Sequence, residues 1–307
     1  MFLSRKSRSR RYFLLFLMLA GAFGVACWYW GWFEIAAYRL LIETSDESPT
    51  RLGLEDYRVG IDALPLAGIE KNISGLTYHR ERNTLFAVIN RPAQIAELTL
   101  DGRVKRCIPV KGVDDLEGIS HMRRGNEFFI TDERTQRVIH VEIGDDQLEV
   151  DATGRPRVGL AFDLAGNLGF EGVSWDHTHD RLFVVKEKRP LRLFEFSGLV
   201  PFVDGRGLDL EVGEWQMRGS SAWLLRDLSS LTYHEDSGNM LLLSDESRLI
   251  VELGPERRPS GLMVLRRGWH GLRADVPQAE GVAVGPRGEI FVVSEPNLFY
   301  RFDPPRR

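Results

Sequence analysis

The sequence predicts an all-β protein: a single β-propeller of five four-stranded blades, closed by an N-terminal strand and preceded by one transmembrane helix. One motif occurs five times. It consists of a short strand, a polar turn and a second, apolar strand that ends in a polar or acidic residue. Its equivalent residues stand at positions 74, 117, 171, 229 and 280. A repeat of roughly 40 to 50 residues built from short strands is typical of propeller blades. A long uncharged run near the amino terminus predicts the helix.

The amino terminus has the pattern of a membrane anchor. Residues 1–11 form a basic tail containing the run RKSRSRR, and residues 12–33 carry no charge. At about 1.5 Å per residue, this uncharged segment makes a helix of roughly 33 Å, long enough to cross the bilayer core. Basic residues before the span favour a cytoplasmic amino terminus and place Trp28, Trp30 and Trp32 at the outer interface.

Two other interpretations of this segment stay open. The small residues between Ala20 and Ala26 are compatible with cleavage of a signal peptide, and Cys27 after the sequence GVA is compatible with lipid attachment. All three interpretations export the rest of the chain. Residues 34–56 are expected to form a juxtamembrane segment and linker, followed by the propeller domain over residues 57–307.

The strands of four blades follow from alternating apolar residues and turn signals. The first blade is expected at ISGLTYH, TLFAVIN, QIAELTL and RVKRCIPV, with Asp101-Gly102 in its last hairpin. The second is expected at LEGISHM, NEFFITDE, RVIHVEI and PRVGLAFDL, and the third at FEGVSWD, RLFVVKE, LRLFEF and LDLEVGEWQM. The fourth is expected at LSSLTYH, NMLLLSDE, LIVELG and GLMVLRRG.

The fifth blade has three strands after the fourth blade, AEGVAVG, EIFVVSE and LFYRFD, and needs one more. The strand YRVGIDALPL at residues 57–66 precedes the first blade and has no other partner. If it pairs with LFYRFD, the ring closes and an exposed edge disappears. This count favours five blades over six.

Composition limits the functional classes. The net charge of −4 and the mixing of acids with bases argue against nucleic acid as a partner. The two cysteines, Cys27 and Cys107, make no disulfide framework, and neither has the surroundings of a catalytic thiol. The sequence also lacks a nucleophile elbow, a phosphate-binding loop, a dinucleotide fingerprint and a histidine-rich zinc pattern.

The repeat predicts a ring of acidic side chains. The first strand of a propeller blade lines the channel and the second runs antiparallel beside it, so the start of one meets the end of the other. The ring is expected to contain the glutamates and the asparagine at these strand ends: Glu117, Glu133, Glu171, Glu187, Glu246, Glu280, Glu295 and Asn90. The alternative is that acids at these positions only close the hairpins.

Clustered carboxylates need compensating positive charge. A hard cation such as Ca²⁺ is one source, with Glu117, Glu171 and Glu280 as its predicted ligands. The protein itself is the other, because five basic residues adjoin the same strand ends: Arg91, Arg134, Lys186, Lys188 and Arg248. Arg134 and Lys186 are therefore included in the predicted binding site, and both sources stay open.

The histidines are expected to have structural roles. The segment DHTHD at residues 176–180 joins two strands at the mouth opposite the glutamates, where a polar turn is expected. His79, His121 and His234 recur at the ends of first strands, which indicates a repeated packing or turn role.

Several of these motifs also carry a resemblance. The runs NISGLTYHRERNTLFAVINRPAQIAEL, DLEGI, ITDER, GFEGVSWD, VVKEK and QAEGVAVGPRGEIFVVSEPNLFYRF are similar, in this order, to the SdiA-regulated family of bacterial envelope proteins, also called the YjiK family. The resemblance covers about residues 57–303. It implies a β-propeller behind a basic and then apolar leader, and it implies no established activity.

A more distant similarity connects the chain with calcium-dependent propeller esterases and lactonases and with phytase-like propellers. That similarity implies inner-strand glutamates that hold a metal ion. Ser74 and Ser229 depart from the pattern, because they stand where two of the glutamates would be.

Two functional hypotheses follow. The first is a binding module, anchored in the bacterial inner membrane with its propeller in the periplasm, that presents the acidic face to a small molecule or an envelope protein. The second is a Ca²⁺-dependent hydrolase of esters or phosphoesters, with a carboxylate activating water. The absence of a recognisable catalytic base favours the binding module, and the fold alone does not decide between them.

Overall fold

The computed structural model describes residues 4–29, 32, 35–36, 40, 50–122, 125–159, 169–207, 209–217 and 225–305. The chain divides into two compact units, Met1–Thr44 and Ser45–Arg307.

The first unit contains one long helix, α1 (Ser4–Tyr29). Its segment Arg10–Cys27 has a mean hydropathy of 1.5 and is long and apolar enough to cross a membrane, a property that signal sequences share. The length and composition of the helix are therefore those of a membrane span or a signal sequence. Trp30 and residues 41–49 of the expected linker lie outside the described residues.

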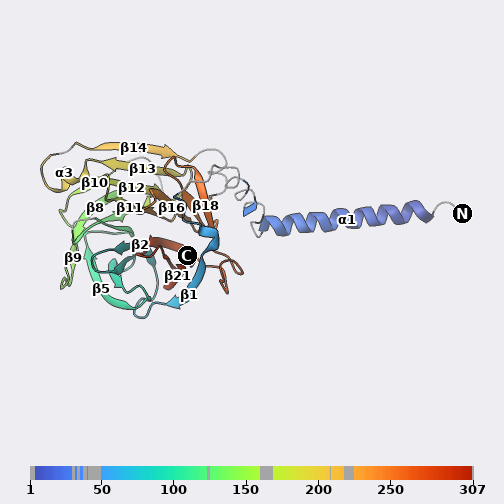
Figure 1. Cartoon of the computed structure of the whole chain (residues 1–307), viewed down its shortest axis with the longest axis horizontal. Helices are drawn as coiled ribbons and strands as arrows, with labels where there is room; N and C mark the ends of the chain where they lie inside the picture. The colour runs from blue at the N-terminus through green and yellow to red at the C-terminus, as the bar shows by residue number, and fades with distance from the viewer. Residues whose placement is uncertain are drawn as a thin grey trace. The chain divides into compact units, whose positions relative to one another are not determined.

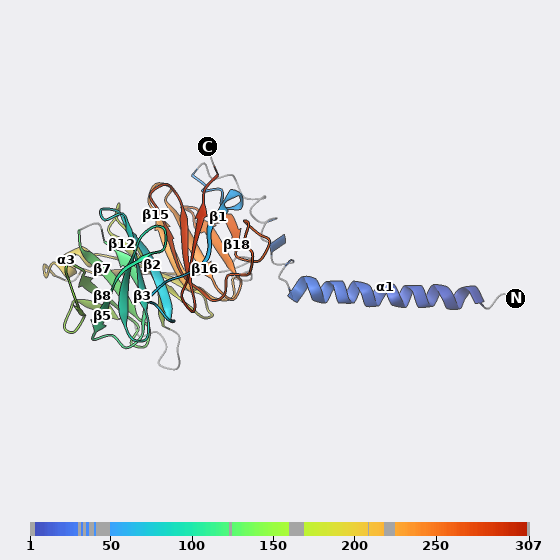
Figure 2. The ribbon, with the colours of Figure 1, turned by 90° about the horizontal axis from the view of Figure 1, so that it is seen from below.

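The second unit is a propeller of five antiparallel four-stranded blades, as predicted (Figures 1 and 2). Blade 1 consists of β2 (Ile73–His79), β3 (Thr84–Ile89), β4 (Gln94–Leu98) and β5 (Val104–Lys111); blade 2 of β6 (Leu116–His121), β7 (Glu127–Asp132), β8 (Arg137–Glu142) and β10 (Arg157–Gly159); blade 3 of β11 (Phe170–Asp176), β12 (Arg181–Lys186), β13 (Arg192–Ser197) and β14 (Glu211–Gln216); blade 4 of β15 (Ser230–His234), β16 (Asn239–Ser244), β17 (Leu249–Leu253) and β18 (Pro259–Val264); and blade 5 of β19 (Ala279–Val284), β20 (Ile290–Ser294), β21 (Leu298–Asp303) and β1 (Arg58–Pro65).

The N-terminal strand closes the ring. β1 pairs antiparallel with β21, from Arg58 opposite Asp303 to Pro65 opposite Leu298. In Figure 1 the blue strand β1 accordingly lies beside the red strand β21. The pairing covers the edge of the last blade, which is the reason that five blades suffice.

Three elements were not predicted. The short strand β9 (Val150–Asp151) pairs in parallel with β5 of the preceding blade. A 3₁₀ turn, η1 (Leu54–Asp56), precedes β1, and a helix, α3 (Leu199–Val203), follows β13. The strand PRVGLAFDL is found only as Arg157–Gly159, because residues 160–168 lie outside the described part of the chain.

The core lies between neighbouring blades. One cluster joins Phe86, Val88 and Ile95 of blade 1 to Phe128 and Ile130 of blade 2, and comparable clusters lie at three further interfaces. Successive strand residues point to opposite faces of a sheet, so each blade buries both faces against its neighbours. The second strands are consequently buried, and β3 and β16 are buried along their whole length.

The glycine of the Glu-Gly repeat allows the inner strands to approach one another. A Cβ atom on Gly118 would lie 2.6 Å from the backbone oxygen of Glu171, and one on Gly75 would lie 2.5 Å from that of Glu117. Gly172 and Gly281 face the next inner strand in the same way. Packing therefore explains the glycine of the Glu-Gly motif.

Side-chain hydroxyls hold neighbouring inner strands together. The backbone N–H of Trp175 donates to Ser120 Oγ over 2.8 Å, and that of Tyr233 donates to Ser174 Oγ over 2.9 Å. Thr77 Oγ1 accepts from the N–H of His121 in the same way, over 3.2 Å. The inner strand of each blade pairs with another strand of its own blade on one side only. On its other side, along the channel, these hydroxyls satisfy its N–H groups.

We expect Ser120→Ala to lower the free energy of unfolding by about 1–3 kcal/mol, because it leaves the buried N–H of Trp175 without an acceptor. Each kcal/mol corresponds to about 2–4 °C in Tm for a domain of this size. Thermal unfolding followed by circular dichroism measures the change. Thr178→Ala is the control, because the Thr178 side chain is exposed at the same end of the channel. An equal Tm for the two variants would contradict the role of this hydroxyl.

Candidate functional site

In blades 1, 2 and 5, a backbone hydrogen bond joins the start of the inner strand to the end of the second strand of the same blade. The N–H of Glu133 donates to the carbonyl of Asp115 over 2.9 Å, and the N–H of Glu295 donates to that of Gln278 over 3.0 Å. In blade 1 the N–H of Asn90 donates to Asn72 O, also over 3.0 Å. This repeated bond brings the two polar positions of a blade to one mouth of the channel.

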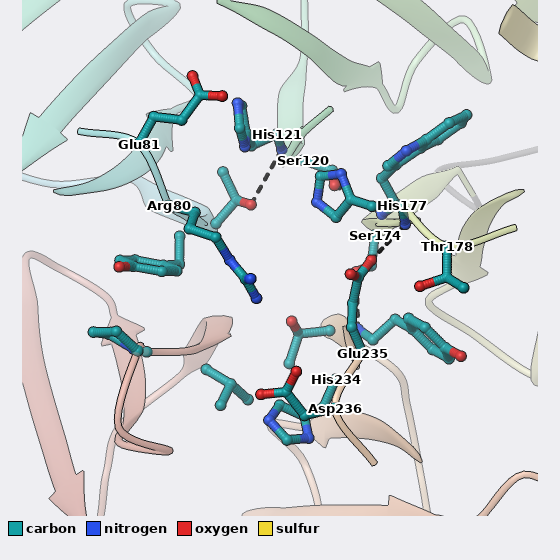
Figure 3. A pocket seen from close by; sticks show the side chains of 18 residues that line it. Arg80, Glu81, Ser120, His121, Ser174, His177, Thr178, His234, Glu235 and Asp236 are labelled. Atoms are coloured by element: carbon teal, nitrogen blue, oxygen red, sulfur yellow. Dashed lines mark hydrogen bonds between the residues drawn. The ribbon is translucent and has the colours of Figure 1, made fainter. Parts of the chain in front are cut away.

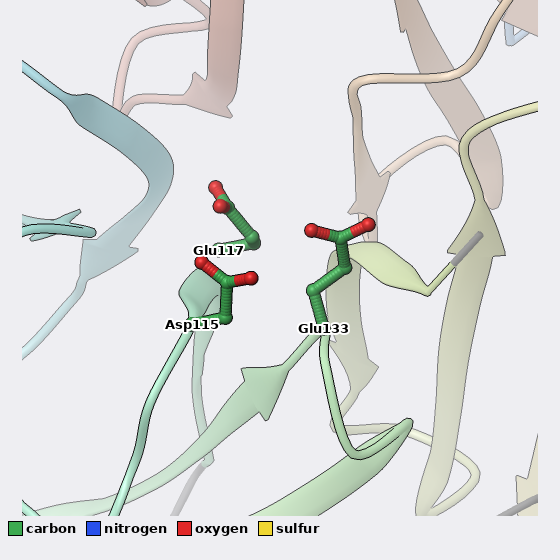
Figure 4. A group of neighbouring side chains, drawn as sticks. All are labelled: Asp115, Glu117 and Glu133. Atoms are coloured by element: carbon green, nitrogen blue, oxygen red, sulfur yellow. The ribbon is translucent and has the colours of Figure 1, made fainter. Parts of the chain in front are cut away.

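Two groups of carboxylates converge there. Ligand oxygens of Asp115, Glu117 and Glu133 lie within 4.8 Å of one another, and so do those of Glu133, Glu171 and Glu187. Figure 4 shows the side chains of the first group with their carboxylates turned towards a common space. Glu133 belongs to both groups. We call the mouth with these five residues the acidic mouth.

A local irregularity contributes to this geometry. The pairing of β6 with β7 shifts between Leu116 and Ile119, and that of β11 with β12 shifts between Phe170 and Val173. Such bulges bend a strand and re-aim its side chains. Glu117 and Glu171 occupy these bulges.

Burial and mutual repulsion disfavour ionisation at the acidic mouth. Burial, with the neighbouring charges of Glu133, Asp115 and Glu295, raises the pKa of Glu117 to about 8. Burial and the charge of Glu117 raise the pKa of Glu171 well above its usual value. The pKa values of Glu133 and Glu295 are also raised, mainly by burial.

The pKa of Glu280 is raised further than that of Glu117. Burial raises its pKa to about 9, with further contributions from the charges of Asp245, Glu117 and Glu295. Glu280 lies outside both convergent groups. The predicted ligand set of Glu117, Glu171 and Glu280 is therefore not brought together as a group of three, while Glu133 is close to the first two.

The basic residues compensate only part of this charge. Lys188 Nζ lies 2.5 Å from Glu187 and 3.0 Å from Glu246, and Arg91 lies 3.0 Å from Asp115. Of the other three predicted cations, Arg134 Nε is 3.9 Å from Asp115 and Arg248 pairs with Asp275. Lys186 is buried at the end of β12, where it stands opposite Phe170 of β11.

Nearby cations do not cancel the effect of burial at two of the glutamates. Burial raises the pKa of Glu133 and Glu295 by more than the nearby charges of Arg91 and Lys71 lower it.

The residues of the acidic mouth fit a hard divalent cation. All donors are oxygens, the ligand type that Ca²⁺ prefers in sets of about six to eight. Asn90 donates a hydrogen bond from Nδ2 to Glu117, while its buried Oδ1 receives none from any described residue. That orphaned oxygen beside Glu117 is a further potential ligand.

The two serines at glutamate positions have a structural role. Ser74 Oγ donates to the carbonyl of Glu117 over 2.9 Å, and Ser229 Oγ donates to that of Ala279 over 2.7 Å. Each hydroxyl thus binds the adjacent inner strand.

A cavity of about 610 Å³ opens at the other mouth of the channel, at the C-terminal ends of the inner strands (Figure 3). Its wall includes Arg80, His121, His177, His234, Glu235 and Asp236. We call it the Arg80 cavity.

The residues of this second mouth were predicted only as turns. Asp176 indeed closes the DHTHD turn, accepting from the N–H groups of Thr178 and His179 over 3.0 and 3.2 Å. His79 and His121 stack with ring centroids 3.8 Å apart, and both contact the carbonyl of Gly125. The sequence carries no signal for the cavity itself, because its wall comes from turns of several blades.

Comparison with known proteins decides the family. A sequence model described as SdiA-regulated matches residues 50–303. The chain belongs to the SdiA-regulated family. The match covers the whole propeller, so the repeated Glu-Gly motif and the acidic mouth are features of an SdiA-regulated domain.

Solved structures similar to this SdiA-regulated chain share its fold. The glutaminyl cyclase of Myxococcus xanthus is 14% identical with a TM-score of 0.51, over 81% of this chain and 98% of that one. A luciferin-regenerating enzyme is 12% identical with a TM-score of 0.50, over 80% and 95% of the two chains. At these identities the likeness shows the β-propeller alone.

Proposed function

We propose that this SdiA-regulated protein is a membrane-anchored binding module whose propeller holds a calcium ion at the acidic mouth and uses it to bind an anionic small molecule or envelope protein. The observation that carries this proposal is that two clusters of three carboxylate side chains converge at this mouth and have Glu133 in common. A bound cation with free coordination positions would present a positive centre within an acidic rim.

The electrostatics support a cation rather than a purely protein-neutralised ring. Lys188 contacts Glu187 and Glu246, and Arg91 contacts Asp115. The more deeply buried Glu117 accepts a hydrogen bond from the neutral amide of Asn90, and burial raises the pKa of both Glu117 and Glu171. Buried carboxylates in such a position either keep their protons or bind a metal ion. Calcium binding would release those protons.

The localisation belongs to the same proposal. The apolar segment Arg10–Cys27 follows basic residues, and such a helix inserts with its basic end in the cytoplasm. In a bacterial inner membrane this orientation puts the propeller in the periplasm.

We expect isothermal titration calorimetry and metal analysis of the full chain in detergent micelles to find bound calcium. Glu133→Gln removes a ligand from both groups, so we expect its calcium affinity to fall by about tenfold or more. The control is Glu149→Gln, because Glu149 is exposed and pairs with Lys111 on the outside of the propeller. Absence of calcium binding, or equal affinity in both variants, would contradict the proposal.

A metal-dependent hydrolase is the second candidate function. Protonated carboxyls next to a metal ion are potential general acids, and Glu280 and Asp227, with pKa values raised by burial to about 9 and about 6, are placed at this mouth. A screen of ester and phosphoester substrates with and without calcium separates the two functions. Calcium-dependent turnover that Glu280→Gln abolishes would favour the hydrolase.

A further inference from the structure

We propose that the Arg80 cavity is a second binding site, separate from the acidic mouth, for a zwitterionic ligand with a carboxylate and an ammonium group, such as an amino acid or a short peptide. The cavity volume of about 610 Å³ is in the range of about 300–1,000 Å³ that is usual for small-molecule sites. It lies at the opposite end of the inner strands from Glu117 and Glu171, so the two sites do not share residues.

Arg80 provides the positive end. Its side chain extends towards the centre of the cavity in Figure 3. It has no hydrogen-bond or ion-pair partner among the described residues, although Glu235 and Asp236 line the same cavity. A guanidinium in this position offers a forked set of donors that matches a carboxylate.

Glu235 and Asp236 provide the negative end. They follow β15 and lie across the cavity from the backbone of Arg80 in Figure 3. Glu235 already accepts the N–H of His177, whereas Asp236 is exposed and accepts no hydrogen bond from the described residues. Since no oxygen of either acid lies within 4.0 Å of the Arg80 guanidinium, the opposite charges are separated by space that a ligand can fill.

Two of the three histidines in the wall have pKa values shifted towards the neutral form. Burial and the charge of His79 lower the pKa of His121 to about 4, and burial lowers that of His234, where the charges of Asp236 and Arg80 act in opposite directions. Arg80 is the one Lys or Arg side chain among the lining residues, which also include Glu81, Glu235 and Asp236. This balance disfavours simple anions and favours ligands that bring an ammonium group.

The remaining wall suits an organic ligand. Tyr78, Trp175 and Tyr233 add aromatic surface, and Thr232 adds a hydroxyl that makes no hydrogen bond with the described residues. Within those residues, no group of three metal-ligating side chains converges at this mouth.

The test uses the full chain in detergent micelles, dialysed against a mixture of the twenty standard amino acids and, separately, a mixture of tripeptides with free termini. Mass spectrometry then measures the ratio of bound to free concentration for every member. We expect at least one member to be enriched over protein-free micelles. We expect Arg80→Gln and Asp236→Asn each to reduce that enrichment by about tenfold, the usual effect of losing a charged hydrogen bond.

The controls separate this site from surface charge and from the acidic mouth. Arg103→Gln and Asp146→Asn change an exposed base and an exposed acid elsewhere, and Glu133→Gln changes the acidic mouth, so all three are expected to retain the enrichment. Absence of enrichment, or enrichment that survives both cavity substitutions, would overturn the proposal. Equal binding of the same tripeptides after N-acetylation would overturn the assignment to zwitterions.

Discussion

With a chelator present, the propeller is expected to lose thermal stability as the pH rises from 6.5 to 9. Glu117 and Glu280 have pKa values of about 8 and about 9 in the folded protein, above the ordinary value of 4.5. The folded state therefore binds more protons than the unfolded state between these values. A group of this kind stabilises the fold at low pH and stops doing so as the pH rises through its folded pKa.

The upper part of this window isolates the glutamates. His121 has its pKa lowered to about 4, mainly by burial, so its effect on stability has the opposite sign and fades out above the ordinary histidine pKa of about 6.5. We expect the Tm in chelator to fall by several degrees across the window, since about 1 kcal/mol corresponds to 2–4 °C. Calcium should restore the Tm most strongly at the alkaline end, because it takes the place of the lost protons.

Differential scanning calorimetry of the full chain at a series of pH values measures this effect. The double variant E117Q/E280Q removes two of the titrating carboxyls and is expected to reduce the slope of the profile. The control E149Q should retain the slope, because Glu149 is exposed and pairs with Lys111. A profile that is flat in the wild-type protein with chelator would show that the acidic mouth is neutralised without protons or metal.

Gly172→Ala is expected to destabilise the propeller by about 3 kcal/mol or more. A Cβ atom at this position would lie 2.7 Å from Leu231 N and 2.8 Å from Ser230 Cα. Both atoms belong to the backbone of the next inner strand, which cannot move without opening the channel. At about 2–4 °C per kcal/mol, the expected loss in Tm is about 6–12 °C.

The matched control is Gly213→Ala in the outer strand β14, where the nearest atom, Glu195 Cβ, is 3.8 Å from the added carbon. We expect this variant to unfold within about 2 °C of the wild-type protein, because the added methyl group has room. Chemical denaturation should show the same order through the midpoint. Similar midpoints for the two variants would mean that close approach of the inner strands is not the reason for glycine in the repeat.

The repeat was enough to predict the blades. Strand alternation and hairpin turns are local properties, so each of the five copies could be divided into strands without knowing its neighbours. The same reasoning correctly assigned residues 57–66 to the last blade, because a three-stranded blade leaves an open edge that only this strand could cover. The short parallel strand β9 was missed, because two residues carry no periodic pattern.

The sequence was enough to predict which residue types form the candidate site, but not which of these side chains lie together. The end of the second strand does meet the start of the first, as the bonds of Glu133 to Asp115 and Glu295 to Gln278 show. Asp115 was overlooked, although it stands two residues before Glu117, because the repeat draws attention to one acid per strand. The metal-binding role of these residues stays a prediction.

By itself, then, the sequence determined the fold class, the blade count, the closing strand and the family, because these depend on short-range patterns repeated along the chain. Only the tertiary structure decided which carboxylates share a space, which of them Lys188 neutralises, and that Arg80 faces a cavity. Packing of neighbouring blades brings together residues that are far apart in the sequence, such as Glu133 and Glu171. Bulges and close strand contacts, which a linear pattern does not encode, then set the direction of each side chain.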